Sequence, residues 1–443
     1  MEPPRPSRRG PRRGRFATGA SSVPGYAAAL CAALALLAGR AAAGEGPTPP
    51  EGKVRIKEIR TFGNEETSRG VILHYCEFEA GDVLAQKELD HKIRRTERNL
   101  INTQFFSRIH VFDLPRSDPR EAVIMVDVAE GTDWHLSADT WQIRLSKENI
   151  GGDAVTVGAE FGLEIQRLFY EQPWIFDAPL VAGASAFFEN GHQTRIEDDD
   201  GYYSERFSHE AAGMEASLGY IINFRTTVGL AALGEYVNYY DPRFKIDPDG
   251  RFGVRPEARL FAARPYVEWD GRDNDLYPTR GFFVGLRGEL SPPAVSDYDY
   301  AGFEGEVRGY VSPGGRFVLA ERIRGGVTAD ATPYIRRISI RGADGLRNAA
   351  ASRTIGTRAF VATTEIRRRL FRSPLFDAWF EGVVFFDAGR AWDPGQPVEF
   401  GDFDYAFGPG LRLHMRSPVY FDWRAELNFN GGLAFYATAR RAF

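Results

Sequence analysis

The feature of this chain that most constrains its fold is an alternation of apolar and polar residues with a period of two. In residues 419–429 the two kinds of position separate completely, with Phe421, Trp423, Ala425, Leu427 and Phe429 on one face and Asp422, Arg424, Glu426 and Asn428 on the other. The pattern recurs in 154–164, 261–270 and 404–416. A period of two is typical of β-strands, because successive side chains point to opposite faces of a sheet. A soluble β-sandwich and a membrane barrel both show it, so strand length and connections must separate them.

The predicted strands are long and numerous. Most have ten or more residues, the length that a tilted strand needs to cross the hydrocarbon core, whereas strands of soluble proteins usually have about five or six. We expect strands near residues 153–163, 165–175, 179–190, 211–222, 226–238, 258–270, 281–290, 301–311, 317–328, 358–370, 378–391, 404–415, 419–429 and 432–443. A weaker pair at 133–138 and 140–149 would raise the number from fourteen to sixteen.

The connections between these strands alternate in length. Long polar loops follow the strands that end at residues 190, 238, 290, 328 and 391, and short ones lie at 223–225, 271–280, 312–316, 371–377 and 416–418. Long loops on one side and short turns on the other are typical of outer-membrane barrels. The sequence therefore predicts a mainly β fold, with a transmembrane antiparallel barrel of 14–16 strands, preferably 16, over residues 132–443. An even strand number would place both ends of the barrel on the short-turn, periplasmic side.

The composition fits this class and excludes others. The chain has 443 residues, and no run of 18 apolar residues follows position 45, so membrane-crossing helices are excluded. The 47 glycines suit many turns, and the 33 Phe, 18 Tyr and 7 Trp suit aromatic girdles at the two membrane interfaces.

The N-terminal segment has the pattern of an export signal. Six arginines precede a short apolar run and the small-residue site Ala41-Ala42-Ala43, so we predict a signal peptide at 1–43 and a Pro- and Gly-rich linker at 44–52. Its removal takes away seven arginines and one glutamate, and the net charge changes from −5 to −11. An acidic mature chain argues against nucleic-acid binding. Cys76 would be its only cysteine, so no intrachain disulfide is expected.

Residues 53–131 are predicted to form a small α/β domain before the barrel. The order is a strand at 53–64, helices at 65–74 and 86–102, and strands at 107–114 and 122–131. This β-α-α-β-β order, with Phe62-Gly63-Asn64, 102–106 and 126–131, resembles a polypeptide-transport-associated (POTRA) domain; a generic small α/β domain is the alternative. The resemblance implies a periplasmic domain whose exposed sheet edge receives unfolded or extended client proteins by strand addition.

Three further segments, in order along the barrel, resemble the outer-membrane assembly family that includes BamA, TamA and the two-partner-secretion transporters. The first, 269–281, resembles the family's periplasmic turn and contributes Asp270, Arg272, Asp273, Pro278 and Gly281. The second is Ile340-Arg341-Gly342-Ala343, similar to the tip of the family's inward-folding loop. The third is Phe385-Phe386-Asp387-Ala388-Gly389. The resemblance covers nearly the whole mature chain.

The resemblance and the alternation together suggest a lock inside the barrel. Asp387 shares the predicted lumenal face with Glu381, so a loop threaded into the lumen would bring Arg341 to a carboxylate that suits its guanidinium. We predict that Arg341, beside Gly342, pairs with Asp387, with Glu365 as the alternative partner. The other reading is that Arg341 is a solvated loop charge. Phe435 and the terminal Phe443 are predicted to belong to a C-terminal targeting strand.

The motifs of enzymes are missing from the sequence. It has no HExxH or His-Cys metal spacing, no G-x-S-x-G elbow and no P-loop, so we expect no catalytic residues, metal or cofactor. The preferred hypothesis is an outer-membrane assembly or translocation factor with a seam between its first and last strands. A two-partner-secretion-type export channel and a structural or adhesive barrel are the alternatives. Expected partners are outer-membrane lipids, client proteins at residues 53–131, and a periplasmic or inner-membrane protein.

Overall fold

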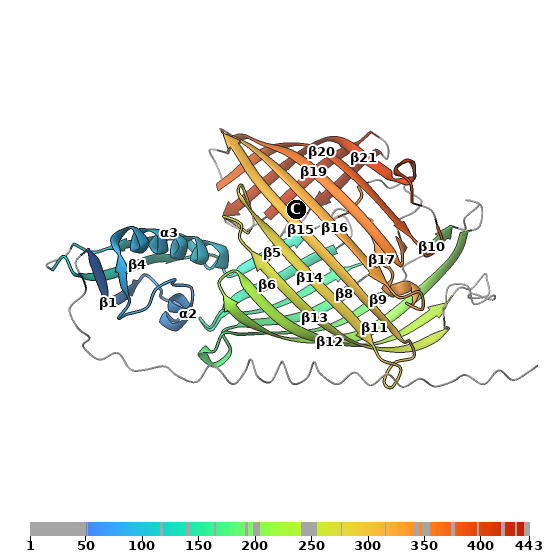
Figure 1. The fold of residues 1–443 in the computed structure, drawn as a ribbon, viewed down its shortest axis with the longest axis horizontal. Helices are drawn as coiled ribbons and strands as arrows, with labels where there is room; N and C mark the ends of the chain where they lie inside the picture. The colour runs from blue at the N-terminus through green and yellow to red at the C-terminus, as the bar shows by residue number, and fades with distance from the viewer. Residues whose placement is uncertain are drawn as a thin grey trace, which may run out of the picture. The chain divides into compact units, whose positions relative to one another are not determined.

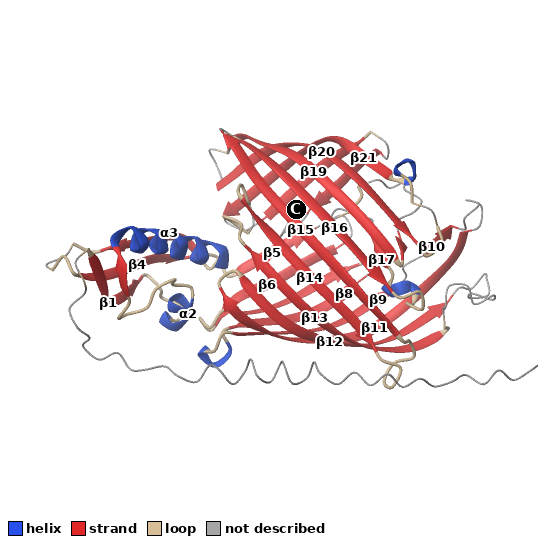
Figure 2. Cartoon of the chain, in the orientation of Figure 1, coloured by secondary structure: helices blue, strands red, loops and turns tan. Residues whose placement is uncertain are grey.

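The computed structural model describes residue 50 and residues 52–437, apart from 116–117, 139–141, 164, 191–193, 198–203, 241–254, 276, 315, 341–344, 348–354, 374–376, 397, 418–420 and 430–431. The predicted signal peptide at 1–43 therefore lies outside the described residues. Strands make up most of the rest, as Figure 2 shows. Within the described part, no helix is long and apolar enough to cross a membrane.

The N-terminal part of the described chain is a small α/β unit. It contains β1 (Lys53–Phe62), α2 (Arg69–His74), β2 (Val83–Ala85), α3 (Gln86–Thr103), β3 (Phe106–Asp113) and β4 (Glu121–Glu130), and the sheet order is β2-β1-β4-β3. Strands β1 and β4 are parallel, and β2 and β3 form the antiparallel edges. The predicted order is confirmed except for β2, three residues long, which the sequence analysis took for part of a connection.

Local chemistry explains the ends of these elements. The Ser68 hydroxyl accepts a hydrogen bond from the Val71 amide at 3.3 Å and so caps the start of α2. Gly63 follows β1 with φ +80°, and an added Cβ there would lie 2.0 Å from the Val128 carbonyl oxygen. Only glycine fits this close approach. The unit has its own core, which includes Ile56, Ile72, Leu89, Leu100 and Ile124, each fully buried.

The remaining strands form one large antiparallel sheet (Figure 1). Its early strands are β5 (Trp134–Ala138), β6 (Gln142–Ile150), β7 (Val155–Gly162), β8 (Ile165–Pro173), β9 (Leu180–Asn190), β10 (Thr194–Glu197), β11 (Ser204–Asn223), β12 (Thr226–Tyr240) and β13 (Glu257–Asp270). Its later strands are β14 (Gly281–Ser291), β15 (Tyr300–Gly314), β16 (Phe317–Thr328), β19 (Arg358–Arg372), β20 (Asp377–Trp392), β21 (Asp404–Ser417), β22 (Phe421–Asn428) and β23 (Gly432–Ala437). Every predicted strand has a counterpart; β11 starts earlier than predicted.

The strand order brings the two ends of this sheet together. It runs β10-β11-β12-β13-β14-β15-β16-β19-β20-β21-β22-β23-β5-β6-β7-β8-β9, and β9 also pairs with β11 over residues 180–190. The last strand, β23, thus neighbours the first, β5, and the antiparallel sheet closes on itself. The predicted strand number of 14–16 stays a prediction, because residues 139–141 and 438–443 beside this junction are not described.

Burial in the closed sheet is the reverse of that in a soluble protein. Large apolar side chains lie on the exposed face, such as Met214 (69% exposed) and Val384 (60%). Charged side chains lie on the buried face, where Glu365 is 1% and Asp387 0% exposed. An apolar exterior around a charged interior is stable only where the exterior contacts lipid. The alternation alone fits both a soluble sandwich and a membrane barrel. The apolar exterior therefore identifies this sheet as a membrane barrel.

Candidate functional site

The connection between β16 and β19, residues 329–357, has several described residues that pack against the interior of the sheet. One part of it contains the 3-10 turn Tyr334–Arg336 and β17 (Ile338–Ser339), which pairs with β18 (Ile355–Gly356). Tyr334 packs in a buried cluster with Ala211 and Val237 of β11 and β12. The Arg336 guanidinium forms an ion pair with Glu235 of β12. These contacts anchor the entry of the loop on one side of the lumen.

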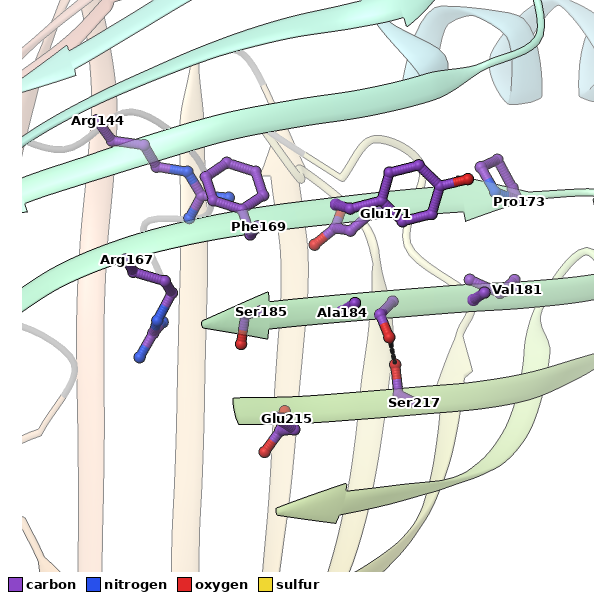
Figure 3. A pocket seen from close by; sticks show the side chains of 13 residues that line it. Arg144, Arg167, Phe169, Glu171, Pro173, Val181, Ala184, Ser185, Glu215 and Ser217 are labelled. Atoms are coloured by element: carbon purple, nitrogen blue, oxygen red, sulfur yellow. Dashed lines mark hydrogen bonds between the residues drawn. The ribbon is translucent and has the colours of Figure 1, made fainter. Parts of the chain in front are cut away.

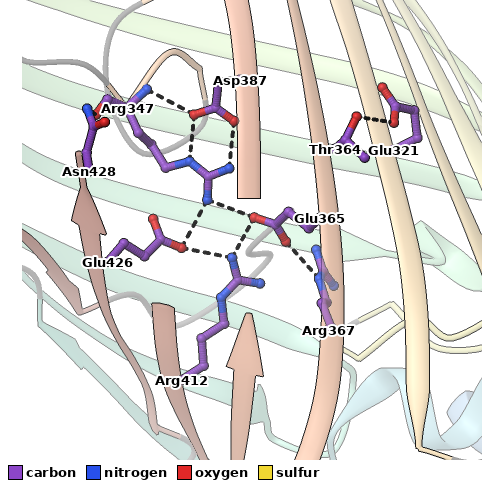
Figure 4. Close-up of polar contacts among 9 residues, drawn as sticks. All are labelled: Glu321, Arg347, Thr364, Glu365, Arg367, Asp387, Arg412, Glu426 and Asn428. Atoms are coloured by element: carbon purple, nitrogen blue, oxygen red, sulfur yellow. Dashed lines mark hydrogen bonds and ion pairs between the residues drawn. The ribbon is translucent and has the colours of Figure 1, made fainter. Parts of the chain in front are cut away.

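A second anchor lies at Arg347, further along the same loop. The Arg347 Nε and Nη2 atoms donate to Asp387 Oδ2 and Oδ1 at 2.7 and 2.6 Å, a bidentate pair (Figure 4). The Arg347 backbone amide donates to the same carboxylate at 3.2 Å. The Arg347 carbonyl accepts from Asn428 Nδ2 at 2.8 Å. Both side chain and backbone of this loop residue are therefore fixed to the barrel wall.

Arg347 also joins a larger network of buried charges. Its Nη1 atom donates to Glu365 at 2.8 Å and to Glu426 at 3.0 Å. Arg412 Nη2 bridges the same two carboxylates at 2.7 and 3.0 Å, and Arg367 Nε binds the other Glu365 oxygen at 2.8 Å. Three arginines thus face three carboxylates in a space where each side chain is at most 6% exposed. The equal numbers of positive and negative charges make their burial tolerable.

Apolar contacts support the charged anchor. Leu346 (1% exposed), Ile338 and Ile340 pack in a buried cluster with side chains of the wall strands β19, β20 and β21, namely Ala359, Val361, Val383, Phe385, Ala391 and Ala406. The Arg347 guanidinium lies 3.8 Å from the centre of the Phe385 ring, a cation–π distance. Burial tends to lower the pKa of Arg347, but the pairing with Asp387 and the two glutamates raises it above its ordinary value. Arg347 therefore stays charged.

The structure brings together part of the predicted lock and adds a residue that the sequence analysis missed. Asp387 and Glu365 both lie in the lumen, as their positions in the alternation indicate, and both bind an arginine of the predicted loop. That arginine is Arg347. Arg341 and Gly342 lie outside the described residues, so the pairing of Arg341 stays a prediction. The loop sequence contains two arginines that follow an apolar residue, Arg341 after Ile340 and Arg347 after Leu346. The sequence analysis chose Arg341 as the lock because Gly342 follows it, as in the motif of the family.

The residues of the predicted turn motif build a rigid reversal between β13 and β14. Arg272, 3% exposed, binds Asp270 in a bidentate pair, with Nε–Oδ1 at 2.9 Å and Nη2–Oδ2 at 2.5 Å. Burial acts to lower the pKa of Arg272. The pairing with Asp270 outweighs this effect and raises the pKa above its ordinary value. The Asp273 carboxylate accepts from the amides of Thr279 and Arg280 at 2.8 and 3.1 Å.

The other two residues of that motif have conformational roles. Gly281 has φ +96°, and an added Cβ would lie 2.3 Å from the Gly271 carbonyl oxygen, so glycine is required. Pro278 is buried within the turn and presets the backbone for the reversal. The five motif residues therefore hold the shape of the turn.

The lumen beside the early strands contains a cavity of about 420 Å³ (Figure 3). It lies among β6, β8, β9 and β11, and its charged lining residues are Arg144, Arg167, Glu171 and Glu215. The Arg144 guanidinium stacks 4.0 Å from the centre of the Phe169 ring. A lining with charges of both signs does not suit the binding of one small apolar molecule.

Other predicted features give no further site. Within the described part of the chain, no three or more His, Cys, Asp or Glu residues are grouped so that they could hold a metal ion. Phe435 belongs to β23, but its side chain and Phe443 lie outside what the structure describes.

A closed sheet with an apolar exterior, a charged lumen and a loop anchored inside defines a membrane β-barrel protein. Residues 149–427 match the family model described as the Omp85 superfamily domain. The chain therefore belongs to the Omp85 superfamily, whose members are outer-membrane assembly and transport proteins and not enzymes. The resemblance inferred from the three sequence segments is thereby confirmed.

Solved structures show the same fold at low sequence identity. BamA from Haemophilus ducreyi lacking POTRA domains 1–3 is 16% identical over 87% of this chain and 83% of its own, with a TM-score of 0.52. CdiB from Escherichia coli is 12% identical over 87% and 75%, with a TM-score of 0.58. CdiB from Acinetobacter baumannii is 13% identical over 87% and 72%, with a TM-score of 0.53. A comparison with curated proteins gave no match.

Proposed function

We propose that this Omp85 protein is an assembly or translocation factor that takes client proteins from the periplasm at residues 53–131. In this proposal the clients pass into or across the outer membrane through the seam between β5 and β23. Residues 1–43 direct export, and residues 44–52 link the exported end to the periplasmic domain. The barrel spans residues 132–443.

The observation that carries the proposal is the junction at which β23, the last strand of the sheet, neighbours β5, the first strand. Other neighbouring strands of the barrel are joined to each other by a connection of the chain, whereas no turn or loop joins β23 to β5. The backbone ladder holds a barrel closed within lipid, so the ladder that can open without straining a connection is the one at this seam.

The small α/β unit offers a place where an extended client could bind. Strand β3 is an edge of its sheet. Its Val111 amide points away from the ladder and donates to the Glu97 carboxylate of α3 at 2.8 Å. A covered edge is protected from unwanted pairing. A client strand that displaced Glu97 would find a backbone donor already positioned for β-augmentation.

The experiment that tests the proposal is a disulfide across the seam. In a Cys76→Ala background, cysteines at residues 135–137 are paired in turn with cysteines at 434 or 435, and the full chain is returned to its native host. We expect oxidised cross-linked protein to fail to maintain the outer-membrane protein profile and dithiothreitol to restore it. Normal function with a fully locked seam would reject a lateral route.

A matched control closes a ladder away from the seam. Val284 of β14 and Val307 of β15 face each other in register, so a cysteine pair there adds the same covalent constraint without touching β5 or β23. We expect this pair to leave function unchanged. If both cross-links were equally harmful, the effect would come from oxidation or rigidity, and the seam would have no special role.

An export channel is the second candidate, and the buried loop is the observation that favours it. Arg347 and its carboxylate partners hold the loop inside the lumen, as a plug would be held. An exporter would keep working with a locked seam and would stop when the loop is cross-linked to the wall. The seam experiment therefore separates the two candidates.

A further inference from the structure

A second lumenal cavity, of about 220 Å³, lies at the end of the barrel that carries the turn 271–280. It shares no lining residue with the cavity beside the early strands, and it adjoins the charge network of Arg347, because Arg367 and Arg412 belong to both. Its lining comes from that turn, from Arg316 immediately before β16, and from β15, β16, β19, β20 and β21.

One wall of the cavity is a rigid aromatic group. The Tyr277 ring meets the rings of Trp379 and His414 edge-on, with centroids 4.6 and 4.8 Å apart, and Trp379 stacks on His414 at 5.2 Å. The Asn274 Oδ1 atom accepts a hydrogen bond from the Tyr277 backbone amide at 2.8 Å and so holds the backbone of Tyr277 in the turn. Interlocked rings keep their shape without a ligand, so the cavity is preformed.

The charge on the lining is strongly positive. Four guanidinium groups, from Arg316, Arg367, Arg369 and Arg412, line the cavity with a single carboxylate, that of Glu381. Glu381 is 3.4 Å from His414. Arg367 and Arg412 are matched by Glu365 and Glu426 deeper in the lumen (Figure 4). Arg316 and Arg369 therefore face one carboxylate, that of Glu381, and one positive charge remains in excess when His414 is neutral.

Arg316, immediately before β16, and Arg369 of the neighbouring strand β19 lie opposite each other. The Arg369 amide donates to the Arg316 carbonyl at 3.1 Å. The Arg369 guanidinium lies 5.2 Å from the centre of the Trp379 ring. Within the described part of the chain, neither guanidinium forms an ion pair with a carboxylate. Each retains donors that an anion in the cavity could accept.

We propose that this cavity binds a phosphate group, either free or as the ester in a phospholipid headgroup. The lining offers two guanidinium groups and an excess of positive charge, and guanidinium forks fit the oxygens of a phosphate in pairs. The cavity is large enough for a phosphate with a glycerol attached and too small for a folded domain. The site does not depend on whether the protein assembles or exports its clients.

The test is calorimetric titration of the full-length mature chain in dodecyl maltoside and a phosphate-free buffer. The probes are sodium phosphate, glycerol 1-phosphate, dihexanoyl phosphatidylglycerol and, as a monoanion without phosphorus, sodium acetate. We expect saturable binding of at least one phosphate probe. Tightest binding of inorganic phosphate identifies the free anion as the ligand, and tightest binding of the phosphatidylglycerol identifies the headgroup.

Matched variants place the binding in the cavity. Arg316→Gln and Arg369→Gln each remove one of these two guanidinium groups and should weaken phosphate binding roughly tenfold to a hundredfold, the range for one hydrogen bond to a charged group. Arg368→Gln is the control, because Arg368 is the adjacent residue, has the same charge and stacks 5.1 Å from the Phe317 ring without lining the cavity. Retention of the heat-modifiable, folded band in gels shows that each variant assembles.

Three results would overturn the proposal. One is the absence of saturable binding of any phosphate probe to the folded wild-type chain. Another is acetate binding as tight as phosphate binding, which would show an unselective positive surface. The third is an equal loss of affinity in Arg368→Gln and Arg369→Gln.

Discussion

Replacement of Arg347 by alanine is expected to release the lumenal loop at a large cost in stability. The contacts show which partner would suffer. Glu365 and Glu426 keep Arg412, and Glu365 also keeps Arg367, when Arg347 is removed. Asp387 is 0% exposed, and Arg347 provides its ion pair in the described part of the chain. The variant therefore leaves one buried carboxylate without a cation, which typically costs about 3–5 kcal/mol.

The assay is the free energy of unfolding from urea titration in lipid vesicles, followed by tryptophan fluorescence, together with single-channel conductance. The control is Arg324→Ala. Arg324 pairs with Glu304 at 2.7 Å, but both side chains are partly exposed, Arg324 at 28% and Glu304 at 39%. Such a half-hydrated pair contributes less than about 1 kcal/mol. Arg347→Ala should be the less stable of the two and should conduct more ions, since the loop no longer fills the lumen.

A double variant sharpens the same prediction. Asp387→Asn in the Arg347→Ala background removes the orphaned charge, so it should recover part of the lost stability. It should not restore the wild-type conductance, because the loop stays unpinned. Stability within about 1 kcal/mol of the Arg324→Ala control, with conductance equal to the wild type, would refute the account of Arg347 as the anchor.

Three further changes test other parts of the structure. Gly281→Ala should destabilise the barrel by roughly 1–3 kcal/mol more than Gly395→Ala. Both glycines have positive φ (+96° and +88°), but only at Gly281 would the new Cβ meet backbone atoms. Equal free energies of unfolding for the two variants would contradict this. Burial raises the pKa of Cys76 from 9.0 to about 12, so the thiol of the folded protein should resist maleimide at pH 8. The contribution of Cys76 to stability should be constant below pH 9 and decline as the pH rises toward 12, because only the unfolded thiol ionises in that range. Rapid labelling of the native protein would show that Cys76 is exposed. Glu97→Ala should free the Val111 amide and increase the binding of extended peptides to residues 53–131. Glu88→Ala, on the first turn of the same helix, should leave peptide binding unchanged. Equal binding by both variants would argue against β3 as the edge that receives clients.

The strands were predictable because the physical reason for their pattern is local. Lipid outside and charges inside impose a period of two on every crossing, and this period can be read in 404–416 and 421–429 without knowing any partner strand. The strand β2 was missed because three residues cannot show a period. The earlier start of β11 was missed because residues beyond the membrane are no longer required to alternate.

The anchor of the loop was only partly predictable because it depends on contacts between distant segments. The alternation places Asp387, Glu365 and Glu426 on the lumenal face, but it does not show which of them meet, since that follows from the register of β19 through β22. The choice between Arg341 and Arg347 likewise depends on the path of the loop. The burial of Leu346 in the wall cluster, which brings Arg347 to Asp387, is a tertiary contact that no local pattern encodes.

Site-specific photocross-linking at the seam tests the central proposal most directly. A photoreactive residue replaces Leu136 of β5, which is 44% exposed, and in a control it replaces Val307 of β15, which is 46% exposed on the lipid-facing side away from the seam. Passage of clients between β5 and β23 predicts adducts with client proteins from Leu136 and none from Val307 in growing cells. Equal yields at the two positions, or none at Leu136, would contradict a lateral route.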